Sequence, residues 1–132
     1  MYSSRMIDPS ETSVTIEPTR RVRGQLRVPG DKSISHRYAL LAAVADGTST
    51  VHNYAPGTDC AATLGCLQAL GVDIQIVQSS PNEPATIMVV GRGRQGLRAS
   101  SSVVDAQNSG STMRLLAGIL AAHPFKTVLT GD

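Results

Sequence analysis

Basic and hydroxyl side chains cluster at the start of a predicted helix, in the segment Pro-Gly-Asp-Lys-Ser-Ile-Ser-His-Arg of residues 29–37. In a helix, Lys32 lies about one turn from His36, and Ser33 lies about one turn from Arg37. The free N–H groups and the dipole of a helix N-terminus attract an anion. These residue types at this spacing therefore predict an anion site, most simply for a phosphate or a carboxylate.

The alternative is that Lys32 and Arg37 are only solvated charges. Cations oppose the dipole at a helix N-terminus, so a helix with a purely structural role favours Asp or Glu there. This favours the ligand interpretation. An apolar stripe follows in the same helix, made of Ile34, Tyr38, Leu41 and Ala45 and widened by Leu40 and Val44. Its helical spacing predicts that the stripe packs in the core.

A second candidate site is the segment Gln-Asn-Ser-Gly-Ser-Thr-Met-Arg at residues 107–114. Asn108 or Ser109 can cap the helix that follows, Gly110 lets a ligand approach the backbone, and positions 111 and 112 add hydroxyls. The alternative is an ordinary Asn or Ser cap followed by an unrelated arginine. Two such helix starts in one small chain favour a functional role for both.

The two helix starts also resemble each other. Asp31 precedes Arg37 by six residues, Asn108 precedes Arg114 by six, and each arginine leads an alanine- and leucine-rich helix. This short match predicts repeated structural units with similar helix starts near one site.

Arginine supplies ten of the twelve cations, and it suits bidentate contacts to carboxylate or phosphate better than lysine does. The net charge of +2 is too small to indicate a nucleic-acid partner. A basic strand region is either a solvated edge or a lining of the same anion cleft, and it contains Arg20, Arg21, Arg23 and Arg27.

The bulk composition indicates one folded domain, because the chain has 132 residues, of which 41% are hydrophobic. The longest strongly apolar runs, 38–45 and 115–122, are far shorter than the roughly 20 residues that cross a bilayer. The polar first residues predict no signal peptide. Cys60 and Cys66 lack the spacing of a redox pair or a disulfide framework, so we expect buried free thiols and a cytoplasmic protein.

Strands and helices are predicted to alternate along the chain. Strands are expected at 14–17, 22–28, 48–54, 72–78, 85–90, 102–106 and 126–130, and helices at 32–46, 58–70 and 109–122. Gly47 and Gly71 are predicted to end the first two helices, and Thr58 to cap the second. The large apolar stripe of the second helix comprises Cys60, Leu64, Leu67 and Leu70. Apolar side chains almost surround the third helix, which predicts that it is buried.

Several ordered motifs together closely resemble the EPSP synthase family, the 3-phosphoshikimate 1-carboxyvinyltransferases. The motifs are residues 29–37, Asp59 with the following Ala-Thr-Leu and Ala-Leu-Gly-Val, Asn-Ser-Gly-Ser-Thr-Met-Arg-Leu-Leu-Ala-Gly from Asn108, and the final Leu-Thr-Gly-Asp. The resemblance covers roughly residues 14–132. A sister enzyme that acts on UDP-N-acetylglucosamine shares the fold but lacks the Lys-Ser-Ile-Ser-His-Arg pattern.

The resemblance implies transfer of the enolpyruvyl group of phosphoenolpyruvate to the 5-hydroxyl of shikimate 3-phosphate, releasing phosphate, in the pathway to chorismate and aromatic amino acids. It implies no metal and no organic cofactor. By motif, Lys32, Ser33 and Arg37 are expected to bind shikimate 3-phosphate. Lys32, Asn108 and Gly110 are expected to bind phosphoenolpyruvate. Fixed cations and helix ends would offset the repulsion between two polyanionic substrates.

The resemblance also implies an α/β fold, a partial inside-out barrel of repeated βαβαββ units, with about one and a half units here. Residues 1–13 are expected to form a flexible extension, 14–20 a strand of the other lobe, and 21–132 the first part of the N-terminal lobe. Because family members are much longer, we expect an N-terminal fragment that is inactive alone. Its expected partners are the anionic substrates and the missing C-terminal part of the enzyme. The complete enzyme is expected to be a monomer that binds neither nucleic acid nor a membrane.

No catalytic residue is expected within the chain, because the family's proton-handling carboxylates belong to the missing part. Asp31, Asp59 and Asp105 are interpreted as turn, cap and strand residues respectively.

Two positions depart from the family pattern. Gln107 stands where glycine is frequent, and Ser111 where threonine is usual. Gly110 is retained, as in members whose site is open to the inhibitor glyphosate. The alternative function is a non-catalytic module that binds anions or has a structural role and uses the same piece of fold.

Overall fold

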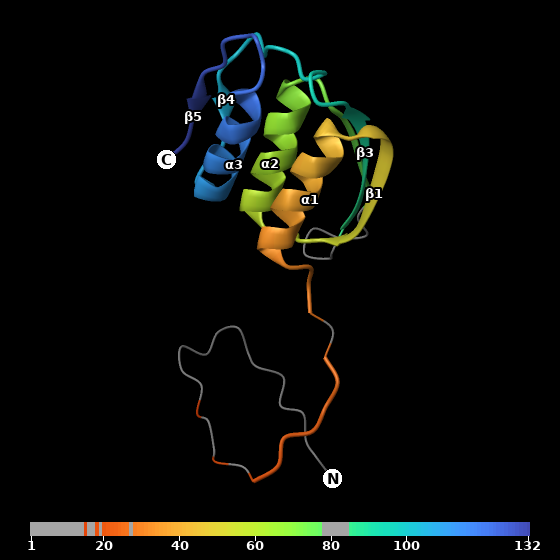
Figure 1. Cartoon of the computed structure of the whole chain (residues 1–132). Helices are drawn as coiled ribbons and strands as arrows, with labels where there is room; N and C mark the ends of the chain where they lie inside the picture. Colours follow the sequence, from red (N-terminus) through yellow and green to blue (C-terminus); the bar gives the residue numbers. More distant parts are fainter. Residues whose placement is uncertain (1–14, 16–17, 19, 27, 78–84) are drawn as a thin grey trace.

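The computed structural model describes residues 15, 18, 20–26, 28–77 and 85–132, and this part of the chain forms three helices and five strands (Figure 1). The helices are α1 (Lys32–Val44), α2 (Thr58–Ala69) and α3 (Gly110–Leu120). The strands are β1 (Asp46–Tyr54), β2 (Asp73–Val77), β3 (Ala85–Arg92), β4 (Val104–Asp105) and β5 (Leu129–Thr130). Their order along the chain, α1-β1-α2-β2-β3-β4-α3-β5, confirms the α/β class.

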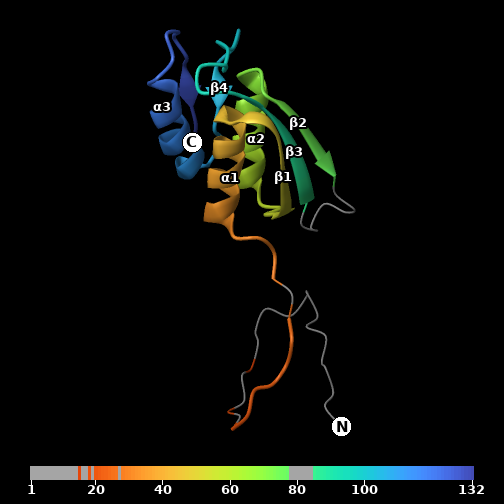
Figure 2. The same cartoon turned by 45° about the vertical axis from the view of Figure 1, so that its right-hand side comes forward.

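An antiparallel sheet of order β1-β3-β2 carries α1 and α2 on one face. Figure 2 shows these two helices between that sheet and α3. Leu67 and Leu70 of α2 are fully buried, as are Ile87 and Val89 of β3. Each such side chain contributes about 1.5–3 kcal/mol by leaving water. The predicted apolar stripe of α2 is confirmed, because all four of its members are buried.

A second, smaller sheet pairs β4 with β5 in parallel, and α3 is the connection between them. The Val104 N–H donates to the Val128 carbonyl over 2.9 Å, and the Ala106 N–H donates to the Thr130 carbonyl over 2.8 Å. A parallel pair needs a crossover of this kind, so β4, α3 and β5 form a strand–helix–strand unit.

Gly71 ends α2 as predicted. Its φ of 86° is in the left-handed region that favours glycine. The Gly71 N–H donates to the Gln68 carbonyl and the Val72 N–H to the Leu67 carbonyl, both over 3.0 Å. These two bonds form a Schellman motif, which satisfies carbonyls at the end of the helix.

Two other predicted helix boundaries are wrong. Helix α1 ends at Val44, with extended backbone at Ala45, and Gly47 lies inside β1, where it pairs with Gly91. The strand begins early because its pairing with β3 starts at Asp46. In α2, Gly57 is the N-cap and Thr58 is the first helical residue, without a capping side-chain bond.

The predicted core stripe of α1 is largely wrong, because Ile34, Tyr38 and Leu41 are 51%, 54% and 62% exposed. Instead α1 buries small residues such as Ala39 and Ala43, which let β3 and α2 approach closely. The three exposed side chains line a groove of about 650 Å³ between α1 and β1. Helix α3 is likewise not buried on all sides. Only Thr112 and Leu116 are buried among its residues.

The strand predicted over 22–28 is not formed by the described residues 22–26 and 28. Val22 and Leu26 are 88% and 84% exposed, and an alternating sequence becomes a strand only beside a partner strand. Residues 1–13 and most of 14–20 lie outside the described residues, so the domain assignment stays a prediction. The strands predicted at 102–106 and 126–130 are confirmed but shorter.

Among the described residues, no helix is long and apolar enough to span a membrane. Cys60 and Cys66 are free and buried, as predicted, and burial raises the pKa of both thiols.

Gly91→Ala is expected to destabilise the fold by about 1–3 kcal/mol, because the new Cβ would lie 2.2 Å from the Ala45 carbonyl oxygen and 2.6 Å from that of Ala42. The matched control is Gly65→Ala in α2, where a Cβ meets nothing within 4 Å. It should stabilise by up to about 1 kcal/mol through helix propensity. Urea unfolding measures both, and equal effects would contradict the close packing of β3 against α1.

Candidate functional site

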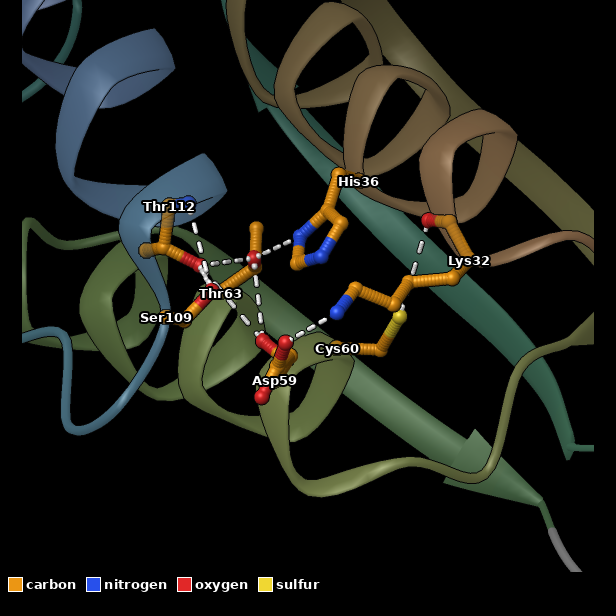
Figure 3. A network of polar contacts seen from close by, with 7 residues as sticks. All are labelled: Lys32, His36, Asp59, Cys60, Thr63, Ser109 and Thr112. Atoms are coloured by element: carbon orange, nitrogen blue, oxygen red, sulfur yellow. Dashed lines mark hydrogen bonds and ion pairs between the residues drawn. The ribbon is translucent and has the colours of Figure 1, made fainter.

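The three helices begin at the same end of the molecule (Figure 1). Side chains from the first two turns of α1 and α2 and from the start of α3 are joined there by hydrogen bonds and an ion pair (Figure 3). The positive ends of three helix dipoles therefore lie together, which favours negative charge at this end. The structure thus brings the two predicted helix starts together and adds a third, that of α2.

Lys32, the first residue of α1, donates a short hydrogen bond to the carboxylate of Asp59 in the first turn of α2. This hydrogen bond raises the pKa of Lys32 above its usual 10.5 and lowers the pKa of Asp59 below its usual 3.8, so both groups are charged at neutral pH. The interpretation of Asp59 as a cap is wrong, because its carboxylate contacts another helix. Asp31, interpreted from sequence as a turn residue, is instead the N-cap of α1, and its side chain accepts from the Ile34 N–H over 2.8 Å.

A buried chain of hydrogen bonds crosses all three helices behind this ion pair (Figure 3). His36 Nδ1 lies 2.6 Å from Thr63 Oγ1, which lies 2.7 Å from Thr112 Oγ1. Thr112 Oγ1 in turn lies 2.7 Å from Ser109 Oγ, the side chain that caps α3. These hydrogen bonds fix α1, α2 and α3 relative to one another at the end where each helix begins.

His36 is fully buried, and burial lowers the pKa of its imidazole below the usual 6.5, against the attraction of Asp59. The ring is therefore neutral at neutral pH. His36 therefore does not belong to the exposed surface of the site, since its Nδ1 contacts the buried Thr63 hydroxyl.

The other predicted site residues of α1 lie on its exposed surface. Arg37 Nη1 donates to the Ser33 carbonyl oxygen over 2.9 Å, which uses one of the five N–H donors of the guanidinium. Both side chains are exposed, so their hydroxyl and remaining guanidinium donors face solvent. Neither they nor Lys32 line the apolar groove beside β1, which is a separate feature of the surface.

At the start of α3, Asn108 and Gly110 are exposed, and Ser109 is the cap. A Cβ at Gly110 would meet nothing within 4 Å, so the backbone there is open to a ligand. Gln107 has a φ of 51°, in the left-handed region that favours glycine. The hydroxyl of Thr112 points into the buried chain and is not offered to solvent, contrary to expectation.

Arg20, Arg21 and Arg23 are exposed, whereas Arg27 lies outside the described residues. Within the described part of the chain, no three His, Cys, Asp or Glu side chains are placed to hold a metal ion. The chemistry this end offers is that of anion binding: the ammonium of Lys32, the exposed guanidinium groups of Arg37 and Arg114, hydroxyls and the free N–H groups of helix starts.

Sequence reasoning missed Thr63 as a site residue and misjudged Asp59. A usable signal was present, because Asp59 and Thr63 are four residues apart and lie on one face of α2, as Lys32 and His36 do on α1. Two polar pairs at this spacing within otherwise apolar helices indicate a contact between the helices.

Thr63→Val is expected to cost about 1–3 kcal/mol of unfolding free energy, because it leaves the buried His36 Nδ1 and the Thr112 hydroxyl each short of a partner. Thr58→Val is the control, since Thr58 is exposed in the first turn of the same helix. It should change stability by less than about 0.5 kcal/mol. Urea unfolding distinguishes the two, and a neutral Thr63→Val would show that the hydroxyl chain adds nothing to stability.

Comparison with known proteins identifies relatives of this chain. The family model described as EPSP synthase (3-phosphoshikimate 1-carboxyvinyltransferase) matches residues 16–132. The 3-phosphoshikimate 1-carboxyvinyltransferase of Solibacter usitatus is 49% identical over 117 residues, and that of Herpetosiphon aurantiacus is 47% identical over 118. Each alignment covers 89% of this chain and 26% of the relative.

Solved structures agree with the sequence relatives. A structure of EPSP synthase from Acinetobacter baumannii superposes with a TM-score of 0.73 at 40% identity, covering 83% of this chain and 24% of that one. The chain thus spans about a quarter of the length of the relatives it matches. Because the family model matches most of its residues, the chain belongs to the EPSP synthase family.

Proposed function

We propose that the chain supplies part of the substrate site of an enzyme that transfers the enolpyruvyl group of phosphoenolpyruvate to the 5-hydroxyl of shikimate 3-phosphate. The observation that carries this proposal is the meeting of three helix starts at one end of the molecule, with Lys32 among them. Both substrates are anions, and clustered positive helix ends stabilise them in close contact. The products are EPSP and phosphate, in the pathway to chorismate.

In this proposal, Lys32, Ser33 and Arg37 bind shikimate 3-phosphate. The exposed guanidinium of Arg37 has donors left for a bidentate contact with a phosphate. Lys32, Asn108 and Gly110 bind phosphoenolpyruvate, for which the open backbone at Gly110 leaves room. The ammonium of Lys32 reaches from α1 to the start of α2, and in this proposal it contacts both substrates.

The proposal includes a larger fold, an inside-out barrel of repeated βαβαββ units to which this chain contributes the first part of one lobe. Two features support it. A capped helix followed by a strand occurs twice, as α1–β1 after Asp31 and as α3–β5 after Ser109. The apolar groove that Ile34, Tyr38 and Leu41 line on α1 is a surface suited to cover by the rest of such an enzyme.

Arg37→Ala is expected to weaken binding of shikimate 3-phosphate to the chain about tenfold, the effect of losing a charge-assisted hydrogen bond worth about 1.4 kcal/mol. Isothermal titration calorimetry measures this. Arg94→Ala is the control, because Arg94 is also exposed but follows β3, beside the end of α1 rather than its start. Equal affinities of wild type and Arg37→Ala would remove Arg37 from the site.

The chain alone is expected to release no phosphate from phosphoenolpyruvate and shikimate 3-phosphate, because the residues that handle protons are proposed to lie elsewhere in the enzyme. Adding a separately produced remainder of the enzyme should restore phosphate release. Lys32→Met in the same mixture should abolish it. A mixture that assembles but stays inactive would favour the non-catalytic module.

A further inference from the structure

Lys32 has two competing uses in the structure. Its ammonium is already held by the Asp59 carboxylate, and it is also the cation proposed to meet the substrates. The two side chains are 59% and 26% exposed, so the ion pair is open to competition from dissolved anions. An anion that takes Lys32 leaves the carboxylate of Asp59 without its partner.

A second polar group at this place lacks a partner. His36 Nε2 is buried and has no hydrogen-bond partner among the described residues. In Figure 3 the ring points this nitrogen toward the side on which Lys32 and Asp59 meet. A buried polar atom without a partner is unfavourable, so a partner gained there stabilises the state in which it is gained.

The series of hydrogen-bonded hydroxyls determines which ring nitrogen of His36 carries the proton. If Ser109 donates to Thr112, Thr112 to Thr63, and Thr63 to His36 Nδ1, every hydroxyl proton has an acceptor within 2.7 Å. The opposite direction leaves the buried Ser109 proton without an acceptor in the chain. Thr63 and Thr112 can also donate to the Asp59 main-chain carbonyl, but only over 3.4 Å. The first direction uses the shorter bonds alone, and it places the imidazole proton on Nε2 as a free donor.

We propose that Asp59 is a displaceable counter-ion: when an anion engages Lys32, the Asp59 carboxylate changes partner and accepts a hydrogen bond from His36 Nε2. The proposal rests on the proposed function, in that it takes Lys32 as an anion-binding group. It makes Asp59 and His36 positioning residues, which hold the α1 and α2 starts together in both states.

The exchange changes the charge around the imidazole. The charged groups that act on it are Lys32 and Arg37 from α1 and Asp59 from α2, while α3 contributes the uncharged hydroxyls of Thr112 and Ser109. With Lys32 turned to an anion and the carboxylate moved to Nε2, the imidazolium form is stabilised. The pKa of His36, lowered by burial, therefore rises when the anion binds, and binding takes up protons between the two pKa values.

The test is an NMR titration of the His36 ring in the 132-residue chain, with and without saturating sulfate, whose charge is constant across the titration. Sulfate should raise the pKa of His36 in the wild type. In Asp59→Asn, which removes the competing charge, sulfate should bind at least threefold more tightly and raise that pKa less. Lys32→Met should show the raised pKa without sulfate and no further response to it.

An unchanged pKa of His36 in wild type saturated with sulfate would overturn the exchange, as would an equal rise in Asp59→Asn. Absence of sulfate binding in both proteins would also overturn it. If Lys32→Met folds poorly, as judged by circular dichroism, Lys32→Gln repeats the measurement. Binding of shikimate 3-phosphate and its dependence on Arg37 are measured separately by calorimetry. The proposed exchange of partners at Asp59 can therefore be contradicted while the proposed function is supported, and the proposed function can be contradicted while the exchange is supported.

Discussion

The hydrogen bonds between the starts of α1, α2 and α3 are the interaction on which the rest of the site depends. Three parallel helix dipoles repel one another where their positive ends meet. The buried hydroxyls of Thr63 and Thr112 hold those ends together, with His36 at one end of the chain and the cap of α3 at the other. The surface above them thereby acquires a fixed positive potential without needing many cations.

Charge at this surface is set by local pairing more than by the net charge of the chain. Lys32 and Asp59 neutralise each other, and Arg37 is tethered to its own helix. The backbone at Gly110 contributes N–H groups that carry no formal charge. An anion at this end therefore meets oriented dipoles first and competes for the ammonium second.

Local sequence signals predicted the elements well wherever the deciding interaction is local. Gly71 ends α2 because only a residue tolerant of positive φ fits there, and Ser109 caps α3 with its own side chain. Apart from the N-cap of α2, which is Gly57 and not Thr58, the failures concern interactions between distant residues. The exposed face of α1 was mistaken for its core face, because the large side chains lie on one side and β3 selects the small ones such as Ala39 on the other.

The candidate site was predictable in part for the same reason. The helix starts carry recognisable residue types, so Lys32 and Gly110 could be singled out from spacing alone. The partner of Lys32 lies 27 residues away on another helix, and helix periodicity in one segment says nothing about which neighbour will face it. Residues 22–26 show the limit most clearly, since alternation along one segment cannot supply a neighbouring strand.

Exposed apolar side chains on α1 also influence how the chain behaves in water. Tyr38 and Leu41 form a contiguous apolar strip with Ile34, next to an edge of β1 that pairs with no other strand among the described residues. Burial of such a strip against another apolar surface is favourable, so this face is the one through which the chain gains most by association. Because Lys32, Ser33 and Arg37 do not line the groove, a contact confined to it leaves their side chains accessible.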